Sequence, residues 1–258
     1  MNTVVILIIV HKKIPTFFEK MSLIQCLNIL GSHPIKLVCP IGLDVSEYLE
    51  VNKDLEFDFI NPNWHSNYTM FNRLKISPFL YERYRDYNYI MFYELDSWVF
   101  RDELLYWCSK GYDYIGAPWI GLNVYSWLYM KNIYPFELKL IWKFLDKSKI
   151  NIVGNGGFSL RKTKSMLINS KLFSFRGRNW DSNEDSFFCH YVSSFNKFFK
   201  VADFPNALKF SFDVSPDKSY QLNNFELPFG CHGFSRSDLP NYVNNFEFWR
   251  DHISELNL

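Results

Sequence analysis

Two acidic residues follow a strongly apolar segment and could hold a divalent cation. Glu94 and Asp96 come directly after residues 89–93, whose pattern predicts a buried strand. Residues two apart in extended backbone point to the same side, so the two carboxylates would face one ligand together. Paired carboxylate oxygens suit Mg²⁺ or Mn²⁺, and such an ion would in turn hold a diphosphate. The alternative is that Asp96 only caps a following helix.

A second acidic cluster, formed by Asp181, Glu184 and Asp185, stands at the start of a predicted helix over 185–195. The exposed N–H groups and dipole of a first helical turn favour acidic side chains. A capping role is therefore enough to explain one residue of this segment, Asn183 or Asp185, without any function. A general base needs an ionised carboxylate within reach of the reacting hydroxyl. Asp185 is expected to stay ionised at such a helix start, and both interpretations stay open.

A glycine-rich loop and one histidine complete the set of candidate site residues. The loop GNGG (154–157) could approach a ligand with its backbone or simply make a tight turn. It is not a phosphate loop, because no Gly-Lys-Ser/Thr follows it. His232 lies in FGCHGF (229–234), between glycines and aromatic residues, and is the histidine best suited to a ligand role. A single histidine is nevertheless more often structural.

Strands and helices alternate around these residues. The segment 4–10 is β-branched and apolar throughout, which is typical of a parallel strand buried on both faces. The next segment predicts a helix that begins near Pro15 and stops at Gly31. Strand, helix, strand is the opening of a doubly wound α/β fold, which binds ligands at the carboxyl ends of its strands. Further strands are expected at 35–39, 56–60, 89–93, 112–115, 158–160 and 207–212, and further helices at 68–84 (kinked or split by Pro78), 102–110, 163–172 and 185–195.

Length, charge and composition restrict the class of protein. The 258 residues contain no repeat, low-complexity tract or linker, which favours one compact domain. Lys plus Arg is 28 and Asp plus Glu is 27, so the net charge of +1 argues against a nucleic-acid partner. Five cysteines without a C-x-x-C pair indicate free thiols in a reducing compartment. No apolar run approaches the roughly 20 residues of a membrane span, and a cytoplasmic location is expected.

Residues 122–149 differ in composition from the rest of the chain, because tryptophan, leucine and isoleucine alternate there with five lysines. An amphipathic helical pair that covers the sheet is the favoured interpretation. The alternative is an interfacial helix in peripheral contact with membrane lipid.

Taken in order, five stretches of the chain resemble a family of bacterial glycosyltransferases from capsule and lipopolysaccharide gene clusters, within the GT-A superfamily. The resemblance implies a GT-A-like, Rossmann-related α/β fold with a mixed, mainly parallel sheet flanked by helices. It implies a single domain over 1–258, with a nucleotide-binding half (1–100) and a donor and acceptor half (101–258) that carries the helical insertion at about 122–149. The stretches are NRLKISPFLYERYRDYNYIMFYELDSWVF (72–100), KGYDYIGAPW (110–119), GNGGFSLRK (154–162), NEDSFF (183–188) and LPFGCHGF (227–234).

The resemblance also implies roles for individual residues. Glu94 and Asp96 take the first and last positions of the superfamily's D-x-D motif, and His232 takes a third contact to Mn²⁺ or Mg²⁺. Glu184 and Asp185 resemble the acidic pair that faces the acceptor, with Asp185 as the catalytic base. The remaining implied contacts are His11, Lys12, Asn72, Arg73 and Asp96 with the nucleotide, and Asn155, Gly156, Gly157, Trp119 and Trp180 with the donor and acceptor sugars.

The activity implied is transfer of a sugar from a nucleotide-sugar donor, with a UDP-sugar favoured, to a glycan or lipid-linked acceptor in bacterial surface polysaccharide synthesis. The enzyme would work in the cytoplasm or at the inner face of the membrane. A base on the face opposite the leaving group would invert the anomeric carbon. A sugar nucleotidyltransferase and a non-catalytic carbohydrate-binding protein on the same fold are the alternatives.

Overall fold

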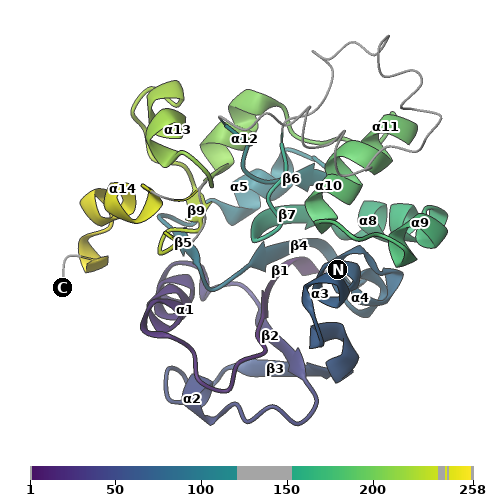
Figure 1. The fold of residues 1–258 in the computed structure, drawn as a ribbon, viewed down its shortest axis with the longest axis horizontal. Coiled ribbons are helices and arrows are strands. Elements are labelled where there is room, and N and C mark those ends of the chain that lie inside the picture. Colours follow the sequence, from purple (N-terminus) through teal and green to yellow (C-terminus); the bar gives the residue numbers. More distant parts are fainter. Residues whose placement is uncertain (1, 121–152, 238–241, 243, 257–258) are drawn as a thin grey trace.

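A mixed sheet forms the centre of the protein (Figure 1). The computed structural model describes residues 2–120, 153–237, 242 and 244–256. Neighbouring strands pair in parallel on the β3 side of the sheet, as far as β4, whereas β7 runs antiparallel to both β4 and β6. The strand order is β3 (Glu56–Ile60), β2 (Ile35–Pro40), β1 (Asn2–Ile9), β4 (Tyr87–Tyr93), β7 (Phe158–Lys162) and β6 (Tyr114–Ile115).

The first strand, β1, is buried on both faces because its alternate side chains enter two different cores. Val4, Ile6 and Ile8 pack on one face of the sheet, and Val5 and Leu7 pack on the other. The prediction of a doubly buried parallel strand is therefore confirmed. The first face is covered by α1 (Phe17–Leu30), α2 (Ser46–Leu49) and α5 (Leu104–Ser109), and the second by α3 (Tyr68–Ile76), α4 (Pro78–Arg83) and α8 (Thr163–Leu172).

A second, three-stranded sheet places late parts of the chain beside the end of β4. Its central strand β9 (Gly230–His232) pairs antiparallel with β5 (Ser97–Val99) and parallel with β8 (Ser211–Phe212). A third apolar core packs against this sheet. The remaining helical elements are η1 (Pro62–His65), α9 (Ser174–Arg178), α10 (Glu184–Ser186), a π-helical turn (Phe187–Val192), α11 (Ser193–Phe195), α12 (Phe204–Phe210), α13 (Pro216–Leu222), α14 (Asn245–His252) and η5 (Ser254–Leu256).

Local capping decides where two of the predicted helices begin. The hydroxyl of Thr16 accepts a hydrogen bond from the Glu19 N–H, while the Glu19 carboxylate accepts one from the Thr16 N–H. This capping box starts α1 at Phe17 and leaves Pro15 just outside it. The predicted helix over 68–84 is split at Ser77, whose hydroxyl caps α4.

Two predicted elements differ from the structure. The strand predicted at 207–212 is wrong: residues 204–210 form α12, because the Asp203 carboxylate accepts from the Asn206 N–H and Pro205 fits the first turn. Only Ser211 and Phe212 are extended. The helix predicted at 185–195 is present, but a π-helical turn interrupts it. The predicted insertion at 122–149 lies outside the described residues.

Two further features of the described residues concern the cysteines and the length of the helices. All five cysteines are buried free thiols. Among the described residues, no helix combines the length and the apolar character that a membrane span requires.

Candidate functional site

The chain turns sharply after β4 and brings two carboxylates together. The N–H of Ser97 donates to the carbonyl oxygen of Glu94 at 2.8 Å, and this turn leads directly into β5. A turn, and not the extended backbone that we predicted, therefore places Glu94 and Asp96 on one side. Because strand β5 and not a helix begins directly after Asp96, the capping alternative for Asp96 is wrong.

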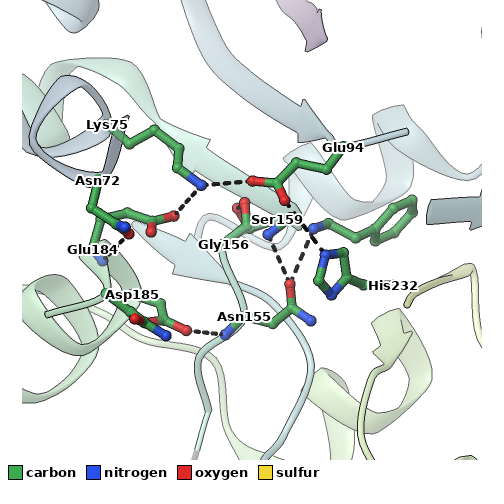
Figure 2. Close-up of polar contacts among 12 residues, drawn as sticks. Asn72, Lys75, Glu94, Asn155, Gly156, Ser159, Glu184, Asp185 and His232 are labelled. Atoms are coloured by element: carbon green, nitrogen blue, oxygen red, sulfur yellow. Dashed lines mark hydrogen bonds and ion pairs between the residues drawn. The ribbon is translucent and has the colours of Figure 1, made fainter. Parts of the chain in front are cut away.

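Strand pairing adds a histidine to this turn. Ser97 of β5 lies opposite His232 of β9, so the imidazole reaches the carboxylates from the neighbouring strand. His232 Nε2 lies 3.1 Å from Asp96 Oδ1 and 3.5 Å from Glu94 Oε2 (Figure 2 shows Glu94 and His232). Burial disfavours the imidazolium, but the charge of Asp96 and the hydrogen bonds to Asp213 outweigh it and raise the pKa of His232 well above its ordinary value.

The three side chains fit a divalent cation. One ligand atom from each of Glu94, Asp96 and His232 lies within 4.8 Å of the other two. His232 Nε2 is buried and makes no hydrogen bond of suitable geometry within the described part of the chain, although it faces two carboxylates. The raised pKa of His232 means that Nε2 carries a proton that faces these two carboxylates, and a divalent cation would displace this proton and take its place between the same atoms. Two carboxylates and one imidazole form a donor set that suits Mn²⁺, and Mg²⁺ less well.

Asp213 orients this histidine, and the sequence analysis missed it. Phe212 of β8 pairs with Cys231 of β9, so Asp213, one residue later, lies beside His232. Asp213 Oδ1 is 3.0 Å from His232 Nδ1 and also accepts from the Tyr242 hydroxyl at 2.8 Å. A carboxylate on one ring nitrogen fixes the tautomer and turns the other nitrogen toward the cation position. Its signal in the sequence was an acidic residue directly after an apolar segment, as at Glu94.

A buried lysine connects the cation position to the second acidic cluster (Figure 2). Lys75 Nζ lies 2.7 Å from Glu94 Oε1 and 3.0 Å from Glu184 Oε1. Arg161 also pairs with Glu184, at 2.8 Å. Burial works against every charge here, yet the opposite charges outweigh it: the pKa of Lys75 is raised, and the pKa values of Glu94 and Glu184 are lowered. All of these groups therefore stay ionised.

Asp185 has a different environment from Glu184. Its Oδ2 accepts from the Asn155 N–H at 2.8 Å and its Oδ1 from the Ser186 N–H at 2.6 Å. Burial and the neighbouring charge of Glu184 raise the pKa of Asp185 to about 7. The expectation that Asp185 stays fully ionised is wrong, because the side chain is only 4% exposed. Asn183 does not cap the helix with its side chain.

The loop 154–157 passes between the two acidic groups with almost no clearance. A Cβ atom on Gly156 would lie 1.8 Å from Glu184 Oε1, and one on Gly157 would lie 2.2 Å from the His232 ring. Asn155 adopts a left-handed conformation (φ 63°), and its Oδ1 accepts from the Gly157 N–H. The loop is thus a tight turn, and its backbone also lies close to the side chains of Glu184 and His232.

Glu94 and Asp96 line a cavity of about 420 Å³ at the carboxyl ends of β1 and β4. His11 and Lys12, for which we predicted contacts with a nucleotide, line the same cavity. Other lining residues that we did not predict include Tyr48, His65, Tyr68 and Phe71.

Four further predicted residues lie outside this cavity lining. Asn72 Oδ1 accepts from the Glu184 N–H, and Arg73 Nε donates to the Trp180 carbonyl, so both brace the second acidic cluster. Trp180 is buried, and its Nε1 donates to the Asn183 carbonyl. Trp119 packs against the loop at Gly154. Core packing therefore accounts for Trp180, whereas Trp119 adjoins the loop.

The fold is that of GT-A glycosyltransferases. Solved structures with this fold include the bifunctional glycosyltransferase WbbM in its apo form, with a TM-score of 0.57 and 11% identity over 99% of this chain and 52% of WbbM. The galactosyltransferase LgtC with donor and acceptor sugar analogues has a TM-score of 0.53 and 12% identity over 98% of this chain and 96% of LgtC. Mouse xyloside xylosyltransferase 1 in its apo form has a TM-score of 0.53 and 13% identity over 93% of this chain and 100% of that enzyme. The chain spans about half the length of WbbM. The predicted mixed, mainly parallel sheet flanked by helices is confirmed.

Within this fold class, the chain belongs to a family described as proteins of unknown function, DUF5672. The family matches residues 54–232, a range that contains both acidic clusters, the glycine-rich loop and His232. No curated protein matches the sequence.

Proposed function

We propose that this protein is a metal-dependent glycosyltransferase that moves a sugar from a nucleotide-sugar donor, with a UDP-sugar favoured, to a glycan or lipid-linked acceptor. Bacterial surface polysaccharide synthesis is the setting that we propose for it. The observation that carries the proposal is the convergence of Glu94, Asp96 and His232, of which Glu94 and Asp96 line a cavity together with His11 and Lys12. This arrangement lies at the carboxyl ends of parallel strands, where α/β sheets bind ligands.

The chemistry follows from the charge that develops during transfer. Cleavage of a sugar–phosphate bond leaves negative charge on the departing nucleoside diphosphate. A divalent cation held by Glu94, Asp96 and His232 would stabilise that charge, an effect worth several kcal/mol in preorganised sites. Asp213 keeps His232 in the ligating orientation, and Lys75 keeps Glu94 and Glu184 ionised and fixed. In this proposal Glu94, Asp96 and His232 bind the cation, while Asp213 and Lys75 position these ligands.

The acceptor proton is assigned to Asp185, which makes inversion at the anomeric carbon the proposed outcome. Its pKa of about 7 lies near the optimum for a general base at neutral pH. Two main-chain N–H groups hold its oxygens, and a carboxylate has lone pairs left to accept a further proton donor. Glu184 is unsuited to this role, because Lys75 and Arg161 already neutralise it.

A donor screen tests the proposal. Nucleotide sugars are added with and without Mn²⁺, and the melting temperature is measured, because a ligand that binds only the folded state raises it. We expect one nucleotide sugar to stabilise the wild type in the presence of Mn²⁺ and to release a nucleoside diphosphate. Asp96→Asn should lose both effects, and the exposed Asp54→Asn should keep them.

Three outcomes would point elsewhere. Release of pyrophosphate from a nucleoside triphosphate and a sugar phosphate would favour the nucleotidyltransferase. Binding of sugars with no turnover of any donor would favour the carbohydrate-binding protein. Equal turnover by wild type and Asp96→Asn would contradict the cation site.

A further inference from the structure

The most exposed large apolar side chains of the described residues lie on neighbouring segments, and none of them lines the cavity. Among the described residues, Phe198 (88% exposed), Phe175 (77%) and Leu172 (68%) are the three large apolar side chains with the highest exposure. Ile168 and Phe195, each about half exposed, lie on the same elements. We call these five residues the aromatic face. Clustered apolar exposure of this kind marks an interaction surface.

Two contacts hold the two parts of this face together. The Asn196 side-chain amide donates to Asn169 Oδ1 at 2.9 Å, which ties the end of α11 to α8. The rings of Phe173 and Phe195 lie 6.2 Å apart, centre to centre. Figure 1 shows α8, α9 and α11 grouped at one side of the molecule. Phe175, on α9, and Phe198, just after α11, therefore project from neighbouring segments.

Basic residues predominate around the aromatic face. Residues 163–178 and 193–200 contain no Asp or Glu, although the whole chain is nearly neutral. Among the nearby acidic residues, Glu82 of α4 pairs with Lys171, and Asp181 follows α9. The basic residues of the two segments are Lys164, Lys171, Arg176, Arg178, Lys197 and Lys200.

We propose that the aromatic face and its basic residues form a docking surface for an anionic lipid bilayer. Protruding aromatic side chains can enter the boundary between headgroups and acyl chains, while flanking lysine and arginine side chains remain at the anionic headgroups. The most exposed side chains, Phe198 and Phe175, project outward, and no cavity is needed to receive them.

The proposal goes beyond glycosyl transfer and does not depend on it. It places α8, α9 and the end of α11 against the membrane. A bilayer fits this surface better than a protein partner does, because Lys164, Arg178, Lys197 and Lys200 make no ion pair with a carboxylate of the described residues and are spread over two segments. Basic charge that is spread in this way matches the diffuse negative charge of a bilayer surface and needs no specific ion pair.

Vesicle sedimentation of the full chain tests the proposal. Vesicles of phosphatidylcholine alone are compared with vesicles that contain 30% phosphatidylglycerol, at low and high salt. We expect binding to the anionic vesicles only, and weaker binding as salt screens the charge. Phe175→Ser/Phe198→Ser should reduce partitioning at least tenfold, because two exposed aromatic anchors are lost. Lys164→Glu/Lys197→Glu should reduce it by a similar factor.

The controls separate docking from folding. Ile41→Ser/Leu222→Ser changes two exposed apolar side chains on other parts of the surface and should leave partitioning unchanged. All variants should keep the melting temperature of the wild type, because the substituted side chains are exposed. Equal binding to both vesicle types, or loss of binding in the control variant, would overturn the proposal. A fall in oligomer mass in the Phe175→Ser/Phe198→Ser variant, with vesicle binding intact, would assign the face to a second copy of the chain and would also overturn it.

Discussion

His232 and Asp213 form a hydrogen-bonded pair in which Nδ1 of the imidazole lies 3.0 Å from Oδ1 of the carboxylate. Both residues stand at the ends of paired strands in the small sheet, so the backbone itself fixes their separation. This pair determines which ring nitrogen faces Asp96. A site that binds a cation through His232 should therefore depend on a residue that does not touch the cation.

Asp213→Ala should weaken Mn²⁺ binding by about 10- to 100-fold, because the imidazole loses the partner that fixes its tautomer and orientation. Isothermal titration calorimetry with Mn²⁺ measures the change. Asp217→Ala, an exposed position on α13, serves as the control and should bind Mn²⁺ as the wild type does. An Asp213→Ala protein that stays folded and keeps wild-type affinity would show that Asp213 only supports the small sheet.

Lys75→Met should destabilise the fold by about 3–5 kcal/mol, because it leaves the partly buried Glu94 and the buried Glu184 with one cation fewer between them. Urea unfolding measures the free energy. The exposed Lys53→Met should change it little. Removing the charge of one partner as well, in Lys75→Met/Glu94→Gln, should recover part of the loss, since Glu184 keeps its ion pair with Arg161 and no longer faces a second carboxylate. Additive losses in the double variant would contradict a shared ion-pair network.

The sequence was most informative where burial dictates the pattern. The segment 4–10 had to be apolar at every position to be buried on both faces, and that pattern located β1 and, with it, the fold class. The proximity of Glu94 and Asp96 was also predicted, although a turn and not an extended strand produces it. Local patterns of this kind are visible in one sequence.

Contacts between distant segments were not visible in the same way. Lys75 and Asp213 come from helix α3 and from the end of β8, and nothing in their local sequence indicates that they meet Glu94 or His232. Asp185 was expected to stay ionised because it begins a helix, but it is buried against loop 154–157, and burial raises its pKa. Ionisation depends on such burial, which periodicity in the sequence does not report.

Asp185→Asn should reduce glycosyl transfer by at least about 100-fold while donor binding is retained, because a general base typically contributes 10² to 10⁴ in rate. In the wild type, the rate should rise with pH through about 7, since only the deprotonated carboxylate accepts the proton. Initial rates from pH 5.5 to 8.5 and the anomeric configuration of the product measure both effects. Full activity in Asp185→Asn, or retention of the anomeric configuration, would contradict the role of Asp185 as the base. Its remaining role would be to accept the hydrogen bond from the Asn155 N–H.

His190 should make the protein less stable in mild acid. The side chain is 1% exposed and stacks near Trp119, with ring centres 5.1 Å apart. Neither ring nitrogen has a hydrogen-bond partner within the described part of the chain. Burial lowers the pKa of His190 from 6.5 to about 3. Between these values the unfolded chain binds a proton that the folded protein does not, so stability is full above pH 6.5 and falls as the pH falls.

Between pH 7 and pH 5, this histidine should cost the wild type about 2 kcal/mol of unfolding free energy. His190→Phe keeps a ring against Trp119 and removes the titration, so its unfolding free energy should fall by about 2 kcal/mol less over the same interval. Urea unfolding of both proteins at the two pH values gives this difference. The pKa of His65 is also lowered, to about 4, but that contribution is common to both proteins and cancels. Parallel pH dependence in the two proteins would mean that His190 is protonated in the folded state.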